Sequence, residues 1–482
     1  MNFRSVFHLI SHLVMVISAA VALSALVGWA YGDALGTVLP MLGAAVLSGL
    51  LGLGGFWFTR GAVELTRKDG FAVVTLGWLI VAHVGAMPYW MTGAIPHPVD
   101  AFFETISGFT TTGATILTDI EALPRGILFW RSLTQWLGGM GVLLLCVAIL
   151  PFLGVGGMQL YRAEMPGPSK DRLTPRIANT AKLLYGVYVI LTLLQFVALR
   201  LARMSGFDAI NHAFTTLSSG GFSTNNASIA HFESPWIHAI ITLFMAMAGV
   251  NFALHFRWMR GDFRALRRSM ELRVYAGVLG VAVLWIVVNL WATRTQSPAR
   301  LLLDAAFQVV SIVTTTGFAT VDFDIWPLGA RTLMFVLLFT GGCAGSTAGG
   351  IKMMRLIVVC KECFRQIRLF MQPQAVLKVR LDQQSVQPAI VAGIMAFFVA
   401  YNLIFASFTL LMTLYTGDLQ TAASAVIACL GNVGPGFGQV GPTENFAVFS
   451  EPAKILLSFC MLLGRLELFT VLVMFSPGFW KR

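Results

Sequence analysis

Four short segments centred on glycine are the parts of this sequence best suited to chemistry. They read Thr-Thr-Thr-Gly-Ala-Thr around Gly113, Ser-Ser-Gly-Gly-Phe-Ser around Gly221, Thr-Thr-Thr-Gly-Phe-Ala around Gly317 and Asn-Val-Gly-Pro-Gly around Gly434. Glycine adopts, at low cost, the unusual backbone conformations that turn successive carbonyls toward one axis. Rings of carbonyl oxygens can replace the water shell of a cation. The segments therefore predict a cation filter made of backbone atoms.

The candidate filter includes the neighbours of each glycine, because small threonine and serine residues allow four backbones to converge. Its residues are Thr111, Thr112, Gly113, Ser219, Gly220, Gly221, Phe222, Thr315, Thr316, Gly317, Phe318, Asn432, Val433, Gly434 and Pro435. We predict metal-ion ligands from two residues in each segment. These are Thr112, Gly113, Gly220, Gly221, Thr316, Gly317, Val433 and Gly434. A single segment of this kind is most simply interpreted as a polar turn. Four segments in register favour a filter over four unrelated turns.

A regular spacing suggests how the segments are positioned. The glycines lie 108, 96 and 117 residues apart, as in an internal repeat. Residues of helix-capping type precede them by 13 positions, namely Asp100, Asp208, Asp304 and Thr421. Each would begin a helix of about two turns whose partly negative C-terminal end points at the loop. In the fourth repeat Asp418 could be the cap instead, which would place Gly431 in register; we prefer Gly434, because Val-Gly-Pro-Gly better resembles a filter backbone.

Long apolar stretches flank the segments. Of 482 residues, 57% are apolar and 11% charged, and the mean hydropathy is +0.76. These values exclude an ordinary soluble enzyme, a secreted disulfide scaffold and a disordered chain. About 20 apolar residues cross the hydrocarbon core of a bilayer. The predicted spans are 6–30, 36–58, 71–92, 127–152, 179–199, 235–256, 274–293, 329–360, 386–416 and 453–475.

The predicted fold is an all-α membrane protein, with two N-terminal helices and four helix–pore loop–helix repeats around a central pore. The four loops are too rich in Gly, Thr, Asn and Pro to face lipid. Irregular backbone at membrane depth is tolerated only where it is buried in protein or lines water. The predicted units are 1–70 for the two-helix domain and 71–165, 166–270, 271–383 and 384–482 for the repeats.

Basic residues gather in alternate connections. Arg4, 59–70, 154–182, 257–273, 352–380 and the last two residues hold 24 of the 33 lysines and arginines, but only about a third of the acidic residues. Because cytoplasmic loops carry such an excess, both termini are predicted to be cytoplasmic and the filter loops to open outward. The distribution of the +11 net charge therefore predicts the orientation of the chain in the membrane, and we predict no nucleic-acid partner. The acidic remainder favours cations at the outer mouth.

With four repeats and single-glycine loops, the sequence resembles the Trk/Ktr/HKT superfamily of potassium transporters. The additional N-terminal helix pair resembles the bacterial TrkH/TrkG branch. The resemblance covers nearly the whole chain, and it implies potassium uptake across the bacterial inner membrane, with no enzymatic activity and no organic cofactor. It also implies a homodimer and a cytosolic nucleotide-binding partner that controls opening. In some relatives a serine at the position of Gly113 admits sodium, so glycine here favours potassium.

A glycine-rich break interrupts the predicted span 329–360. Five glycines within 341–350 would cost a continuous helix about 1 kcal/mol each. The break is predicted to line the cavity below the filter, and the resemblance implies that it is an intramembrane gate. The alternative is a kink that permits close packing. The candidate gate residues are Gly341, Gly342, Gly345, Ser346, Thr347, Gly349, Gly350 and Arg465.

Arg465 lies inside the last predicted span, where an arginine costs about 2.5–3.5 kcal/mol. The resemblance implies that it is an electrostatic barrier to cations below the filter; the alternative is an ion pair with a neighbouring helix. A second function class is a sodium- or proton-coupled symporter. It would need carboxylates at membrane depth, and the spans offer almost none besides Glu467. A third class, a membrane-embedded enzyme, would need convergent ionisable residues that the sequence lacks.

Overall fold

The computed structural model describes residues 2–61, 66–148, 173–291, 297–382 and 384–480. Within these residues the regular elements are helices, apart from a hairpin of β1 (Arg380–Leu381) and β2 (Gln384–Ser385). The expected all-α fold is therefore confirmed. The predicted boundary at residue 165, most of the basic connection 154–182 and the last two residues lie outside the described part of the chain.

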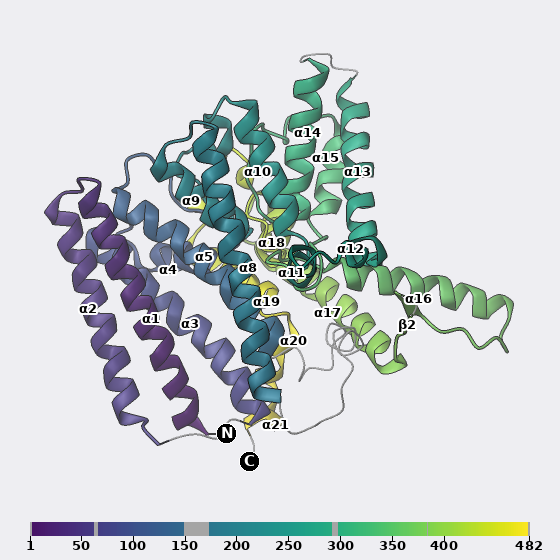
Figure 1. Cartoon of the computed structure of the whole chain (residues 1–482), viewed down its shortest axis with the longest axis horizontal. Helices are drawn as coiled ribbons and strands as arrows, with labels where there is room; N and C mark the ends of the chain where they lie inside the picture. The colour runs from purple at the N-terminus through teal and green to yellow at the C-terminus, as the bar shows by residue number, and fades with distance from the viewer. Residues whose placement is uncertain (1, 62–65, 149–172, 292–296, 383, 481–482) are drawn as a thin grey trace.

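Two N-terminal helices and four repeats follow one another along the chain (Figure 1). The N-terminal pair is α1 (Phe3–Ala30) and α2 (Leu35–Phe58). The first helices of the repeats are α3 (Arg67–Thr92), α8 (Leu173–Leu201), α13 (Met270–Trp291) and α17 (Pro388–Met412). Short helices follow, namely α4 (Pro98–Phe109), α9 (Gly206–Leu217), α14 (Pro298–Val313) and α18 (Leu419–Leu430). The second helices begin with α5 (Arg125–Ala148), α10 (Pro235–Ala248), α15 (Leu328–Leu337) and α19 (Glu451–Arg465).

The short helices begin one or two turns before the residues predicted to cap them. The predicted caps Asp100, Asp208, Asp304 and Thr421 were wrong. The observed N-caps are His97, Ser205, Ser297 and Asp418. In three repeats the predicted residue is the third of the helix, and in two of these it is an aspartate, which is favourable in the first turn as well as at the cap. Asp208, for example, accepts a 2.6 Å hydrogen bond from the Ser205 hydroxyl.

The second helices of the second and fourth repeats are sharply bent, which the sequence did not predict. In the second repeat α10 and α11 (Phe252–Met259) meet at 103°, so the predicted span 235–256 is not one helix. The Asn251 side chain caps α11 by accepting the Ala253 amide at 2.8 Å. An otherwise unpaired amide at the start of α11 therefore has an acceptor directly after the bend.

In the fourth repeat α19 meets the segment Phe469–Phe475, which comprises α20 (Phe469–Leu472) and η4 (Val473–Phe475), at 108°. Glu467, at the bend, has a left-handed φ of 56°. The predicted span 453–475 is therefore also discontinuous. The break predicted within 329–360 is confirmed, because α15 ends at Leu337 and α16 (Met353–Met371) follows only after a long loop.

The short helices form the buried centre of the molecule, and the long helices surround them. Nine of the twelve residues of α18 are buried. In contrast, Leu39 and Leu50 on α2 and Val281 and Leu284 on α13 are exposed apolar side chains, as expected where lipid replaces water. Six helices of the described residues are long and apolar enough to span a membrane, or eight if each bent pair counts as one span.

The two ends of the described chain meet at the start of α3 (Figure 1). The Asn2 amide donates to the Asp69 carboxylate at 2.7 Å, and the Lys68 ammonium lies 3.4 Å from the Gly478 carbonyl in α21 (Pro477–Trp480). The remaining elements are α12 (Phe263–Arg268) and the turns η1 (Ser228–His231), η2 (Gly438–Val440) and η3 (Phe446–Val448). Both ends therefore lie on one side of the helix bundle.

Candidate functional site

The four loop segments share one backbone conformation. The residues two positions before the glycines, Thr111, Ser219, Thr315 and Asn432, have φ between 50° and 56°. The glycines themselves, Gly113, Gly221, Gly317 and Gly434, have φ between 76° and 99°. Gly434 is therefore in register with the other three, and Gly431, with a φ of −79°, simply ends α18. Asp418 caps that helix without shifting the register.

Each loop is also tied back to its own short helix in the same way. The residue before each glycine donates its amide to a carbonyl five residues earlier, at 2.8–2.9 Å. The donor–acceptor pairs are Thr112 to Ser107, Gly220 to Thr215, Thr316 to Ser311 and Val433 to Ala428. Each short helix therefore continues directly into a loop of fixed geometry.

The four glycines form a closed ring of contacts. A Cβ atom built on Gly113 would overlap the carbonyl oxygen of Gly220, one on Gly221 that of Thr316, and one on Gly317 that of Val433. On Gly434 it would lie 2.7 Å from the carbonyl oxygen of Thr112, which closes the circle. The sequence-predicted segments are thus brought together around one axis, and no side chain larger than hydrogen fits at these positions.

The neighbours of the glycines brace this ring. The Asn432 amide nitrogen donates to the Thr112 hydroxyl at 3.0 Å, and Ser311 donates to the carbonyl of Phe318 at 2.7 Å. Pro435 packs beside Gly317, since a Cβ there would lie 2.7 Å from the proline Cδ. The fourth loop therefore contacts both the first and the third, and Ser311 holds the third loop to its own short helix.

Side chains from the short helices contact the part of three loops that follows the glycine, which we call the outer limb. The position nine residues before the glycine holds Glu104, His212, Gln308 and Ala425 in the four repeats. Glu104 accepts the Ile116 amide at 3.0 Å, and the His212 Nε2 lies 3.1 Å from the Ser223 hydroxyl. The Gln308 side chain lies 3.3 Å from the Thr320 hydroxyl. These residues were not predicted, although polar side chains at the same position of three repeats were a usable signal.

The glycine-rich loop between α15 and α16 lies against the base of the four loops. The Gly349 amide donates to the Thr315 hydroxyl at 2.6 Å, and the Thr347 hydroxyl donates to the carbonyl of Leu217 at 2.9 Å. Ser346 and Thr347 are fully buried. The loop therefore contacts the ends of α9 and the third loop segment directly.

Close backbone approaches explain the glycines of this loop. A Cβ on Gly342 would lie 2.7 Å from the carbonyl oxygen of Gly249, and one on Gly341 or Gly349 would overlap a neighbouring carbonyl. Gly345 and Gly350 have positive φ values of 76° and 63°. The bend between α10 and α11 receives the loop, because Cys343 donates its amide to Gly249 at 2.8 Å.

Glu271, near the start of α13, holds both ends of this loop and was not predicted from the sequence. Its buried carboxylate accepts the Ala344 amide at 2.7 Å and the Met354 amide at 3.0 Å. The loop is thus fastened to the first helix of its own repeat. A glutamate at the edge of a predicted span was the signal that could have revealed it.

Arg465 is buried beside the glycine-rich loop, at the end of α19. Its guanidinium donates to the carbonyl of Thr347 at 2.8 Å and lies 3.4 Å from the carbonyl of Gly138 in α5. A second arginine contacts this segment, because Arg355 on α16 pairs with Glu467, two residues beyond Arg465.

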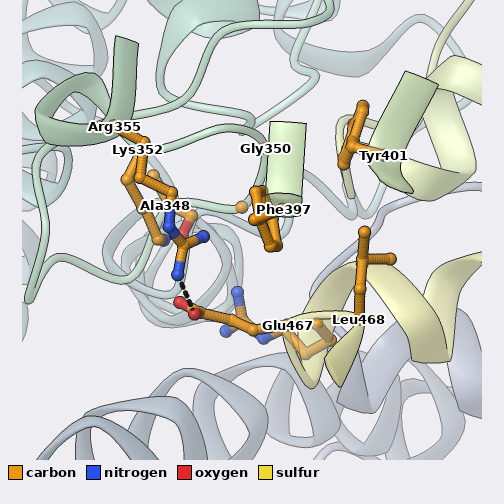
Figure 2. Close-up of a pocket in the computed structure, with 11 residues that line it drawn as sticks. Ala348, Gly350, Lys352, Arg355, Phe397, Tyr401, Glu467 and Leu468 are labelled. Carbon is orange, nitrogen blue, oxygen red and sulfur yellow. Dashed lines mark hydrogen bonds and ion pairs between the residues drawn. The ribbon is translucent and has the colours of Figure 1, made fainter. Parts of the chain in front are cut away.

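A small pocket opens between the loop and the bend of the fourth repeat (Figure 2). Figure 2 shows Arg355 reaching toward Glu467, and the Arg355 guanidinium also stacks 4.0 Å above the Phe397 ring. Lys352 donates to the carbonyl of Ala348 within the loop. Arg355 therefore connects α16 to α17 through the Phe397 ring and to the bend of the fourth repeat through Glu467.

Four spanning repeats, a central ring of loop backbones and a buried broken helix define a membrane transport protein. A family model described as TrkH, cation transport protein, matches residues 42–482. The chain is 42% identical to the Trk system potassium uptake protein TrkH of Escherichia coli K12, with 100% of each chain covered. It is 36% identical to TrkG of that organism, with 89% of each covered.

A solved structure agrees with these sequence comparisons. The crystal structure of the potassium transporter TrkH from Vibrio parahaemolyticus matches with a TM-score of 0.91, at 36% identity and with 100% of each chain covered. The chain belongs to the TrkH family of cation transport proteins. This confirms the family that the sequence indicated and places the chain among transporters, not enzymes.

Proposed function

We propose that this chain carries potassium ions across the inner membrane, with the four loops as its selectivity filter. The observation that supports this most directly is the closed ring of contacts among Gly113, Gly221, Gly317 and Gly434. The relatives are a potassium uptake protein and a potassium transporter, which agrees with it. The proposed ligands are backbone oxygens of these glycines and of the residues preceding them.

Expression in bacterial cells that lack their own potassium uptake tests this proposal. We expect the chain, together with the cytosolic partner from its own organism, to restore growth at low potassium and to take up rubidium. Membrane insertion is checked by fractionation. A correctly inserted chain that neither restores growth nor transports rubidium in vesicles would contradict the proposal.

We propose further that the loop between α15 and α16 is the gate. Its hydrogen bonds to Thr315 and Leu217 support a closed position directly against the filter base. Arg465, which contacts Thr347, would add an electrostatic barrier to cations. The loop is held mainly by hydrogen bonds and small side chains, so it can move without unpacking a large apolar core.

Replacing Glu271 by alanine is expected to raise potassium leak through the isolated chain. It leaves the amides of Ala344 and Met354 without their acceptor, and hydrogen bonds to a charged group contribute about 1.5–3 kcal/mol each. The measurement is rubidium efflux from vesicles without the partner. Glu271→Gln keeps one carbonyl oxygen and should leak less than Glu271→Ala. Equal, wild-type efflux from both folded variants would refute a fastening role.

We propose passive conduction instead of ion coupling. Membrane potential supplies about 2.3 kcal/mol per charge per 100 mV. The buried carboxylates of the described spans are already engaged, since Glu104 pairs with Arg131, Glu467 pairs with Arg355, and Glu271 accepts two amides. A sodium- or proton-coupled symporter would need such a group to bind and release a second ion.

We propose that both termini are cytoplasmic and that the chain acts as a homodimer with a cytosolic nucleotide-binding partner. The basic connections support cytoplasmic termini, and the meeting of both chain ends at α3 supports their lying on one side. The unit boundaries at 70, 165, 270 and 383 follow the repeat pattern. The homodimer and the cytosolic nucleotide-binding partner rest on the family resemblance.

A further inference from the structure

Two side chains of α5 reach across to the second loop. Arg131 and Gln135 lie one helical turn apart and so share a face of the helix. Arg131 donates to the carbonyl of Ser223 at 2.9 Å. The Gln135 amide donates to the carbonyl of Gly220 at 2.7 Å and accepts the amide of Phe222 at 3.0 Å. Side chains of one helix in the first repeat therefore hydrogen-bond to three residues of the loop in the second repeat.

Arg131 also connects this loop to the first one. Its guanidinium pairs with Glu104 at 2.7 Å, and the two side chains are only 2% and 0% exposed. Glu104 in turn accepts the Thr115 hydroxyl and the Ile116 amide, each at 3.0 Å. The Arg131 guanidinium lies 3.9 Å from the centre of the Phe222 ring. One continuous chain of contacts thus runs from the outer limb of the first loop to that of the second.

We call the Glu104–Arg131 pair the brace. Its charge distinguishes it from the side chains at the same position of the other repeats. At the equivalent position the other repeats carry His212, Gln308 and Ala425, and only the first carries a carboxylate. Burying an ion pair costs desolvation that its attraction often fails to recover. A well-packed apolar pair would serve stability as well, so the charged pair is best explained by the geometry that it imposes.

We infer that Glu104 and Arg131 are positioning residues that determine selectivity between potassium and smaller cations, by fixing the distance between the first and second loops. The inference rests on the proposed filter. A ring that can contract would coordinate sodium more readily, whereas a ring held open would favour the larger ion. Neither side chain need touch the ion. Selectivity is a difference of two affinities, so it responds to this spacing even when total flux does not.

The experiment compares sodium and rubidium fluxes through purified full-length chains in vesicles. The double variant Glu104→Gln with Arg131→Met removes the Glu104–Arg131 ion pair without leaving one buried charge alone. Arg131→Lys keeps the charge but loses the planar fork that contacts Glu104 and Ser223 together. The matched control is Glu362→Gln on α16, where Arg365 donates to Glu362 at 2.7 Å and holds the pKa of that carboxyl below its usual range.

We expect the sodium-to-rubidium flux ratio to rise about tenfold in the double variant, the size of a typical coupling between linked sites. It should rise less in Arg131→Lys and remain unchanged in Glu362→Gln. A ratio that stays at the wild-type value in any folded brace variant overturns the inference. If the double variant does not fold, Arg131→Lys decides the question. A wild-type chain that transports no rubidium would instead remove the proposed function itself.

Discussion

Gly221→Ala is expected to lower selective potassium uptake by roughly tenfold or more while leaving the chain folded in the membrane. The new Cβ would overlap the carbonyl oxygen of Thr316, and the residue would have to keep a φ of 76°. The left-handed conformation alone costs an L-residue about 1–2 kcal/mol, and overpacking adds about 1–3 kcal/mol. Since each 1.4 kcal/mol changes a rate tenfold, uptake should fall by roughly tenfold or more.

Rubidium uptake and the sodium-to-rubidium flux ratio in vesicles measure this effect. Gly393→Ala is the matched control: Gly393 lies within α17, and a Cβ there would meet nothing within 4 Å. The control should transport normally. If Gly221→Ala transported rubidium as the control does, with unchanged selectivity, the ring of glycines could not be the filter.

The segments that form the site were predictable because their chemistry is local. Four regularly spaced glycines, three of them near threonine or serine, are visible in the sequence, and the structure gives all four a positive φ between 76° and 99°. The broken helix between Leu337 and Met353 was predictable for the same reason, since five glycines in ten residues cannot form a stable helix. Composition and apolar length were likewise sufficient for the all-α membrane fold.

The parts that were missed depend on partners distant in sequence. Arg131 and Ser223, 92 positions apart, meet only because two repeats pack together. The bend at Glu467 is equally non-local: its carboxylate pairs with Arg355, 112 positions away. Helix starts were misplaced for a different reason, because acidic residues are favourable at both the cap and the first turn. Periodicity identifies elements, whereas the contacts that bend or brace them arise from tertiary packing.

Arg465→Ala is expected to raise potassium flux through the chain in the absence of any partner. The change removes the 2.8 Å hydrogen bond to the carbonyl of Thr347, and with it one of the contacts that hold the proposed gate in place. It also removes a buried positive charge from the proposed ion path. At an effective dielectric constant of 20, a unit charge about 8 Å from an ion raises its energy by about 2 kcal/mol.

Rubidium efflux from vesicles that contain the purified chain alone is the measurement, and an increase of roughly tenfold or more follows from these energies. Arg465→Lys separates the two contributions, since it keeps the charge but offers a single ammonium in place of the guanidinium fork. If the charge dominates, Arg465→Lys should stay near the wild-type flux, whereas if the Thr347 contact dominates, it should approach Arg465→Ala. Arg260→Ala, at the exposed end of α11, is the control for loss of an arginine. An unchanged flux in folded Arg465→Ala would show that Arg465 neither holds the loop nor repels the ion.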